Sequence, residues 1–280
     1  MTYLKVEIGQ PLLGLSRDKY NLLANEVDVV VYNSWRLDFG LAIQSFSPFL
    51  RAALDLVDLS ARSKRNMRIV FISSVSSVAA MAQTTTAPEA PVEDPLTSVN
   101  NGYGQSKLAA ERIVTAAAGR PGVPVSVVRI CQIGGPTDGG QWPDQPWISA
   151  LLRTSKALKY LPNHVTSVDW EPVDIVSSML RDFILHPSTG SGPEPVGGMI
   201  DVHDTIPLKE WTKKLKNITD PIAEDIARMP ALKLLGYNDM LGDGAEHLDF
   251  ATDSAMQNRE VAMPTIDRMM LEKWLHSWVL

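Results

Sequence analysis

Three stretches of the chain are almost continuously apolar and rich in β-branched residues. They are Val27–Tyr32, Arg68–Ser73 and Val125–Ile130. A strand that is covered on both faces has this pattern, whereas a half-exposed strand alternates between apolar and polar positions. We therefore predict three buried strands, each typical of a parallel sheet.

Helical patterns separate these strands. A first helix is expected to begin after Ser16, which would cap it, and to end near Asn25. Further helices are predicted at residues 41–63 and 103–118, and a short strand at residues 5–8. The alternation of strand and helix predicts an α/β fold with a parallel sheet and right-handed crossovers.

The pattern changes after about residue 135, where a glycine-rich turn covers residues 134–140. Helices are expected at residues 147–158, 175–185 and 263–279, an extended segment at 168–173 and a loop at 187–200. We predict an α/β core at residues 1–135 and a mostly helical, substrate-binding region at residues 136–280. The second region is expected to pack on the core as part of one compact unit.

Composition and charge exclude several classes of protein. The 280 residues carry a net charge of −6, with a pI of about 5.4, so no electrostatic argument favours nucleic acid or an anionic membrane. Cys131 is the only cysteine, and no apolar run is long enough to span a bilayer. No histidine lies at ligand spacing near the acids at 169, 171 and 174, so no metal site is predicted. A cytoplasmic protein without a signal peptide is the simplest expectation.

Candidate chemistry centres on Tyr103 and Lys107, four residues apart in a predicted helix. This spacing places both side chains on one helix face, where the ammonium would favour the phenolate form of Tyr103. Such a tyrosine can exchange a proton with a substrate oxygen. Ser74, at the end of the second strand, would hold the same oxygen, although Ser76 and Ser77 are close enough to take that role.

These residues resemble the extended short-chain dehydrogenase/reductase family, and most closely the terminal thioester reductase domains of fungal nonribosomal peptide and polyketide synthetases. The blocks that carry the resemblance are Pro11–Ser16, Val27–Trp35, Phe71–Val78, Gly102–Glu111, Arg129–Thr137, Val168–Asp174 and Met270–Leu275. The resemblance implies a Rossmann-like core and a catalytic triad of Ser74, Tyr103 and Lys107. It also implies that Asn33 lies near the cofactor position and that residues 129–133, including Gln132 and Ile133, line the pocket.

Aromatic residues are further candidates for the substrate pocket. Trp142 and Trp147 could line it, because ligand pockets are mostly apolar and aromatic. Filling a core is the more common role of such residues. Trp35 follows a strand end, which favours a place in the substrate pocket. Ser76 is also a candidate for binding the substrate.

The sequence departs from the reductase pattern at its start. No G-x-G-x-x-G or G-x-x-G-x-x-G motif occurs in the 280 residues, although such a turn holds the cofactor pyrophosphate in these reductases. The resemblance implies a chain that begins at the third strand of the family. Either the chain is complete and has lost its nucleotide site, or it is a fragment of a working reductase. We expect the first, because a fragment would expose buried sheet edges.

Without a nucleotide site there would be no hydride, because no side chain supplies one. The leading hypothesis is therefore a cofactor-independent enzyme of secondary metabolism. It would cyclise or isomerise a polyketide- or peptide-derived substrate, free or tethered to a carrier protein, by polarising a carbonyl group. One alternative is an NADPH-dependent thioester reductase that releases an aldehyde or alcohol. Another is a non-catalytic binding or scaffold protein, and a homodimer that pairs sheet edges is a further expectation.

Overall fold

A computed structural model describes most of the chain as two compact units. The described residues are 2–83, 87, 90–98, 101–118, 123–139, 141–142, 146–162, 170–185, 205–206, 208–218, 221–229, 231–232 and 266–276. The first unit is Met1–Ile130 and the second is Cys131–Leu280. The sequence had placed this boundary at residue 135.

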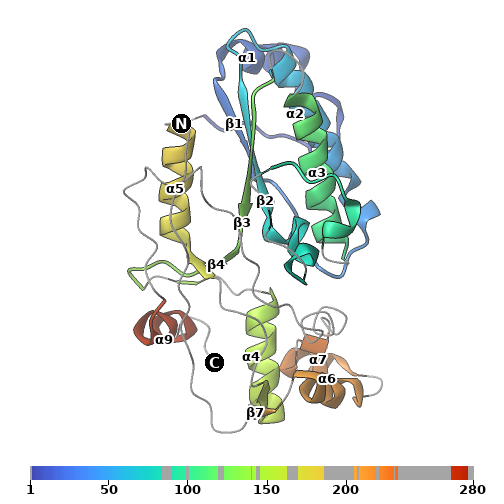
Figure 1. The fold of residues 1–280 in the computed structure, drawn as a ribbon, viewed down its shortest axis with the longest axis vertical. Coiled ribbons are helices and arrows are strands. Elements are labelled where there is room, and N and C mark those ends of the chain that lie inside the picture. Colours follow the sequence, from blue (N-terminus) through green and yellow to red (C-terminus); the bar gives the residue numbers. More distant parts are fainter. Residues whose placement is uncertain are drawn as a thin grey trace. The chain divides into compact units, whose positions relative to one another are not determined.

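The described part of the first unit contains three strands, three α-helices and several 3₁₀ turns (Figure 1). The strands are β1 (Val29–Tyr32), β2 (Arg68–Ser74) and β3 (Val125–Ile130), and the helices are α1 (Arg17–Glu26), α2 (Ser47–Ala61) and α3 (Gly102–Ala118). The 3₁₀ turns are η1 (Pro11–Gly14), η2 (Ile43–Phe46), η3 (Val75–Ser77), η4 (Ala79–Gln83) and η5 (Pro95–Thr97).

The three strands form one parallel sheet in the order β1-β2-β3, as the apolar pattern predicted. Tyr32 of β1 lies opposite Phe71 of β2, and Ser73 of β2 lies opposite Arg129 of β3. Parallel strands need crossover connections, which α2 and α3 supply. The predicted parallel α/β sheet is confirmed.

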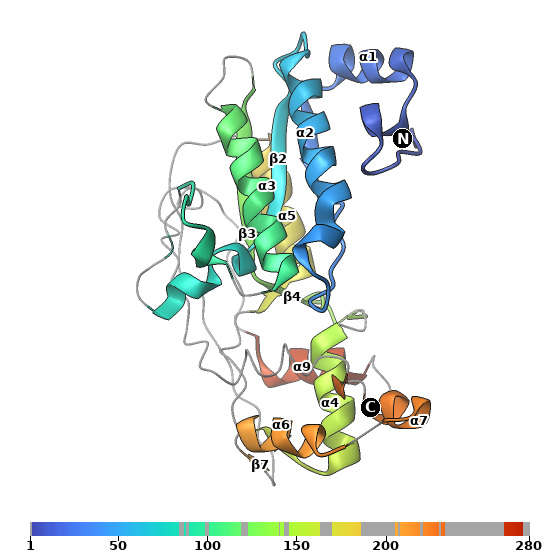
Figure 2. The same cartoon turned by 90° about the vertical axis from the view of Figure 1, so that its right-hand side faces the viewer.

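Side-chain alternation along β2 places its odd-numbered residues toward the helices. Ile69 and Phe71 are fully buried in a core that also contains Val114 of α3 and Leu56 of α2. Helices α2 and α3 pack side by side on this face of the sheet (Figures 1 and 2). The same alternation gives Ser73, at the end of β2, a place on the α3 side.

Two local predictions differ from the structure. Residues 5–8 form no strand. The N–H of Glu7 instead donates to Leu13 O, and the N–H of Gln10 donates to Glu7 O, so this segment is part of a turn. The helix predicted at residues 41–63 begins only at Ser47, after the 3₁₀ turn η2. Pro48 lies in the first turn of this helix. Proline is tolerated there because the N–H groups of the first turn have no acceptor within the helix.

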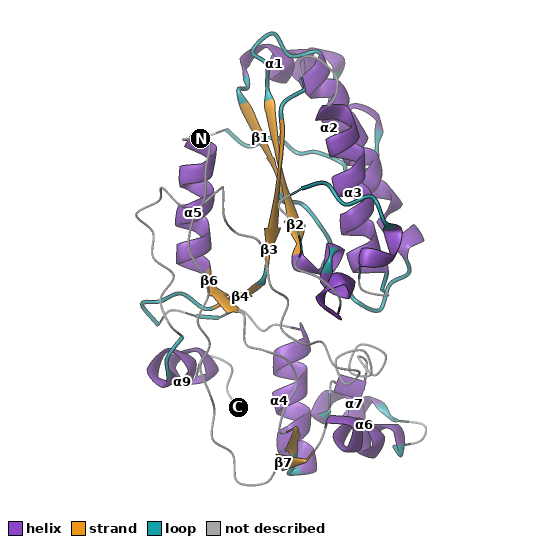
Figure 3. Cartoon of the chain, in the orientation of Figure 1, coloured by secondary structure: helices purple, strands orange, loops and turns teal. Residues whose placement is uncertain are grey.

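The second unit is mainly helical, with short paired strands (Figure 3). Its described helices are α4 (Pro146–Leu158), α5 (Val173–Leu185), α6 (Leu208–Lys216), α7 (Ala223–Arg228) and α9 (Arg268–His276). Its described strands are β4 (Gln132–Gly134), β5 (Leu161–Pro162), β6 (Trp170–Pro172) and β7 (Thr205–Ile206), paired in parallel as β4-β6 and β5-β7. The loop predicted at residues 187–200 lies outside the described residues, as do parts of the predicted segments 168–173 and 263–279.

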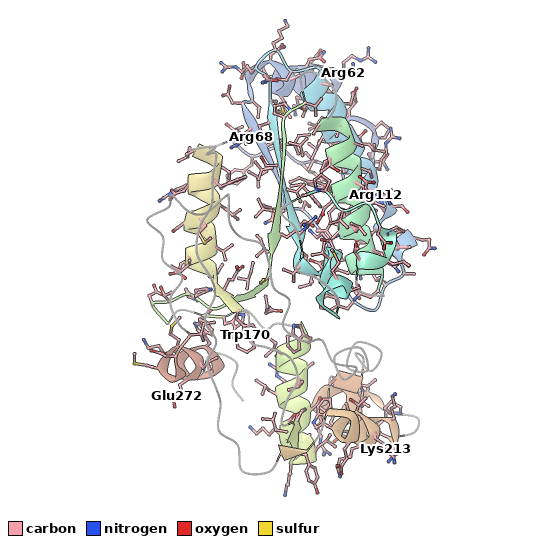
Figure 4. The ribbon with its side chains drawn as sticks, in the orientation of Figure 1. Arg62, Arg68, Arg112, Trp170, Lys213 and Glu272 are labelled. Carbon is pink, nitrogen blue, oxygen red and sulfur yellow. The ribbon has the colours of Figure 1, made fainter. Side chains whose placement is uncertain are left out.

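Tryptophan rings form the centre of packing around β4 and α9. The ring of Trp142 lies 5.1 Å from that of Trp170, labelled in Figure 4, and 5.2 Å from that of Trp274. The indole N–H of Trp274 donates to Pro136 O over 2.9 Å. A Cβ on Gly135 would lie 2.3 Å from the Trp274 ring, so only glycine allows this approach.

Candidate functional site

The first turn of α3 fixes the position of Tyr103. Asn101 caps the helix, because its Oδ1 accepts a hydrogen bond from Gly104 N at 2.8 Å. Gly102 lets the helix approach residues 41–43 closely, since a Cβ there would lie 2.2 Å from Leu41 O. Tyr103 and Lys107 follow on one face, as their spacing predicted.

Lys107 lies in an apolar and aromatic environment beneath the end of β2. Its side chain is almost fully buried, and its Nζ donates to Ile72 O over 2.7 Å. The same nitrogen lies 4.7 Å from the ring centre of Trp35 and 5.1 Å from that of Phe71. Burial lowers the pKa of Lys107 to about 7, although the carboxylate of Glu111 acts in the opposite direction.

Tyr103 packs against the rings of Phe39 and Phe46, at 5.3 Å and 6.4 Å between centres. Burial raises the pKa of its hydroxyl, and a side-chain hydrogen bond with Ser74 partly offsets this effect. The sequence predicted that Lys107 would lower the pKa of Tyr103, but the pKa of Tyr103 is raised. Desolvation dominates instead, and it keeps Tyr103 in its protonated form, ready to donate a proton.

The serines after β2 divide into two groups. The Oγ of Ser74 accepts from Ser76 N at 3.2 Å and donates to Ser76 Oγ at 3.3 Å. The hydroxyls of Ser73 and Ser77 both turn to the carboxylate of Glu111. Ser74, Tyr103 and Lys107 thus lie near one another: Lys107 Nζ is 5.8 Å from the ring centre of Tyr103, and Ser74 lowers the pKa of the Tyr103 hydroxyl. Ser77 instead donates to Glu111.

Two other residues proposed for the pocket belong to the first unit. Trp35 is half-buried beside Lys107, and its indole N–H donates to Ser106 Oγ over 3.1 Å. The Trp35 ring, held by this bond, packs against the Lys107 ammonium. Asn33 follows β1 and is exposed.

The remaining predicted pocket residues belong to the second unit. Trp147 Nε1 donates to Gln132 Oε1 over 2.8 Å, and Ile133 lies next to Gln132 in β4. Trp142 is only 2% exposed and sits in the tryptophan core described above. Gln132, Ile133 and Trp147 thus form one local group, whereas Trp142 has the surroundings of a core residue.

Sequence reasoning did not identify Glu111 as a functional residue. Its carboxylate is buried and makes a two-pronged ion pair with Arg129, with Nη2 to Oε2 at 2.7 Å. The sequence could have indicated its role, because Glu111 lies one helical turn after Lys107 and two turns after Tyr103. Residues at i, i+4 and i+8 share a helix face.

Neither metal clusters nor membrane spans occur in the part of the chain that the structure describes. No three His, Cys, Asp or Glu side chains gather there in a way that could hold a metal ion. Within the same residues, no helix combines the length and apolar character needed to cross a bilayer.

A family model decides the relationship of the chain to known proteins. The model of the NAD-binding family described as "Male sterility protein" matches residues 1–180, which is more than half of the 280 residues. The chain belongs to this male sterility family. The suspected relationship to nucleotide-binding reductases is therefore confirmed.

Relatives of this family member include reductases of fungi. The chain is 29% identical over 299 residues to a carboxylic acid reductase of Neurospora crassa, covering 95% of this chain and 28% of that protein. It is 31% identical over 265 residues to an adenylate-forming reductase of Serpula lacrymans, covering 85% of this chain and 24% of that protein. The chain thus spans between a quarter and a third of the first relative and about a quarter of the second.

Solved structures share the fold. The terminal R domain of the myxalamid PKS-NRPS pathway matches with a TM-score of 0.78 at 23% identity, over 99% of this chain and 74% of that domain. The reductase domain of a nonribosomal peptide synthetase from Mycobacterium tuberculosis matches with a TM-score of 0.62 at 16% identity, over 97% of this chain and 74% of that domain. The Rossmann-like class of this male sterility family member is confirmed.

The prediction that the chain uses no cofactor is wrong, because the male sterility family is an NAD-binding family. The prediction relied on one missing motif. A dinucleotide site is spread over several β-α units, and the glycine-rich turn contacts only the pyrophosphate. The absence of that turn from these 280 residues therefore does not argue against a catalytic role for the residues near the nicotinamide position. The relatives favour the reductase alternative over the cofactor-independent cyclase.

Gly102 offers a test of how tightly α3 is held. We expect Gly102→Ala to lower the free energy of unfolding by about 1–3 kcal/mol, because the new methyl group meets the backbone of residues 41–43. Gly40→Ala is the matched control, since its Cβ would meet only Asp38 Oδ1, at an ordinary 3.5 Å. Urea denaturation measures both. Equal stability of Gly102→Ala and wild type would contradict the close approach.

Proposed function

We propose that this chain carries the catalytic residues of a nicotinamide-dependent reductase that acts on a thioester carbonyl. The observation that carries the proposal is the cluster of Ser74, Tyr103 and Lys107 at the end of β2, within a chain of an NAD-binding family. Relatives named as carboxylic acid and adenylate-forming reductases support the same class of reaction.

The proton for the reaction is assigned to Tyr103. Reduction of a carbonyl group places negative charge on its oxygen, which must then be protonated. The raised pKa of Tyr103 keeps its hydroxyl protonated, so the donor is present before the reaction starts. Ser74 lowers the pKa of the same hydroxyl, which indicates that the two groups are close, and a carbonyl oxygen within reach of both would accept a hydrogen bond from each.

A bound nicotinamide would supply the hydride. The residues present fit the reacting end of such a cofactor. The Lys107 ammonium has three donors, of which Ile72 O accepts one, and this leaves donors for a hydroxyl-bearing group such as ribose. For the pyrophosphate end, the 280-residue sequence offers no glycine-rich turn, and we assign no residue to that role.

The substrate proposed is an acyl thioester, free or tethered to a carrier protein. A hydride added to a thioester carbonyl and loss of the thiolate yield an aldehyde, and the one proton that the reaction consumes ends on the thiol. Tyr103 would lend its proton to the carbonyl oxygen in the tetrahedral intermediate and recover a proton when the C–S bond breaks. Similarity to a terminal R domain of a PKS-NRPS pathway and to a thiolation-reductase di-domain supports a tethered substrate. A second hydride from another reduced nicotinamide, together with a proton on the oxygen, would convert the aldehyde to the alcohol.

Substrate turnover tests the proposal. Protein produced from the full coding sequence is incubated with an acyl thioester and either NADPH or NADH. We expect one of the two cofactors to be oxidised in a one-to-one ratio with aldehyde formed. The free carboxylic acid, which lacks the thiol leaving group, serves as the control and should give no product. Conversion of the thioester to a cyclised product without nicotinamide oxidation would contradict the proposal.

A further inference from the structure

Glu111 is a buried carboxylate that faces the serine turn. It lies on α3 two turns beyond Tyr103, and its side chain is only 4% exposed. Its exposed neighbour Arg112, labelled in Figure 4, instead pairs with Glu93 at the surface over 3.5 Å. A buried carboxylate is unfavourable unless its charge and lone pairs are satisfied, so the partners of Glu111 indicate why it is there.

Those partners come from three different elements. Ser73 of β2 and Ser77 of η3 donate their hydroxyls to Oε1, the second over 2.6 Å. Arg129 of β3 donates through Nε and Nη2 to Oε2, at 3.1 Å and 2.7 Å. The parallel register places Arg129 opposite Ser73, which explains why both reach the same carboxylate.

Glu111 binds residues on both sides of Ser74 in the sequence, namely Ser73 and Ser77. Ser77 Oγ lies 2.8 Å from Ser74 O and 2.6 Å from Glu111 Oε1, but its hydroxyl has only one proton to donate. The charged oxygen is the stronger acceptor, so this proton goes to Glu111. With Ser73 and Ser77 both held, the short turn between them has little freedom to move Ser74.

We propose that Glu111 is a positioning residue: it holds the turn from Ser73 to Ser77 and so fixes the position of the Ser74 hydroxyl. The proposal rests on the proposed reductase function for its consequence in turnover. Its geometric content is independent of that function, because the position of Ser74 Oγ can be measured in a crystal structure.

Charge contributes to the same arrangement. Among the described residues, the charged groups that face Glu111 are Arg129 from β3 and Lys107 from its own helix, and the β2 and η3 partners are uncharged hydroxyls. Removing the carboxylate charge alone would break the ion pair between Glu111 and Arg129 inside the fold, which can destabilise it. The variant Glu111→Gln is therefore tested alone and together with Arg129→Met, which removes the cation of this pair.

Kinetics test the positioning role. We expect Glu111→Gln to lower kcat for thioester reduction about 10- to 100-fold with little change in KM, because a displacement of about 1 Å is enough for such a loss. The double variant with Arg129→Met is expected to fold and to show the same loss. Glu93→Gln removes an exposed carboxylate from an ion pair with Arg112 and should leave kcat unchanged.

The background of Ser74→Ala separates positioning from general damage. If Glu111 acts through Ser74, then adding Glu111→Gln to Ser74→Ala should change kcat by less than about twofold, because the group being positioned is already gone. An equal loss in both backgrounds would overturn the proposal.

A crystal structure of Glu111→Gln decides the geometric claim without turnover. We expect the turn from Ser73 to Ser77 to shift in the variant, so that Ser74 Oγ moves by about 1 Å relative to its position in wild type. An unchanged position of Ser74 Oγ would overturn the positioning role even if kcat falls. Absence of nicotinamide-dependent reduction in wild type would instead refute the proposed function, and the crystal comparison would still decide the role of Glu111.

Discussion

Replacing Tyr103 with phenylalanine is expected to lower kcat for thioester reduction about 10²- to 10⁴-fold, the range for loss of a positioned proton donor. The fold should persist, because the ring contacts with Phe39 and Phe46 do not involve the hydroxyl. Steady-state kinetics with the nicotinamide cofactor measure kcat and KM, and circular dichroism verifies the fold. KM should change little if the hydroxyl acts mainly in the transition state.

Tyr20→Phe is the matched control. Tyr20 is also buried in the first unit, and its hydroxyl donates to Asp55 O over 2.9 Å, within the packing of α1 on α2. Its loss should reduce stability by about 1 kcal/mol and leave kcat unchanged. Full activity of Tyr103→Phe would refute the assignment of the proton donor.

Replacing Lys107 with methionine is expected to change how stability depends on pH. Burial lowers the pKa of Lys107 from 10.5 to about 7 in the folded chain. Between these values the unfolded chain binds the proton and the folded chain does not, so wild-type stability rises with pH. One such group contributes up to about 1.4 kcal/mol per pH unit, and Lys107→Met lacks this contribution.

Urea denaturation of both proteins from pH 6 to pH 10 measures the difference. Below pH 7 both states of wild type are protonated, and the full unfavourable effect of burying the ammonium is present. The stability of wild type relative to Lys107→Met should therefore be lowest near pH 6 and increase steadily above pH 7. Parallel curves across this range would show that Lys107 titrates alike in the folded and unfolded states.

The sheet and the main helices could be predicted because each depends on local pattern. The β-branched run Val125–Ile130 forms the strand that its composition indicated, and Ser16 caps α1 as expected. The spacing of Tyr103 and Lys107 placed both residues on one face of α3. The start of α2 was misplaced, because the apolar pattern continues through a 3₁₀ turn that precedes Pro48.

The electrostatics of the site could not be predicted, because they depend on what surrounds each group. Spacing alone suggested that Lys107 would ionise Tyr103. Only the structure reveals that both side chains are buried, so that desolvation disfavours the charged form of each. The role of Glu111 was hidden for a similar reason. Its partner Arg129 is distant in sequence and reaches it through the strand register.

The cofactor prediction failed because a missing motif was treated as a missing function. The glycine-rich turn is a local sequence pattern, whereas Lys107 and Tyr103 at the reacting end are brought to Ser74 by the tertiary fold. Similarity over residues 1–180 to an NAD-binding family uses information from the whole segment. Residue motifs alone could not supply it.

Isotope transfer tests the central claim most directly. The protein is given an acyl thioester together with nicotinamide cofactor that carries deuterium on the transferable position of its reduced ring. The account predicts an aldehyde with deuterium on its carbonyl carbon, formed by wild type and almost absent with Tyr103→Phe. A product that contains no deuterium, or equal labelled product from both proteins, would contradict it.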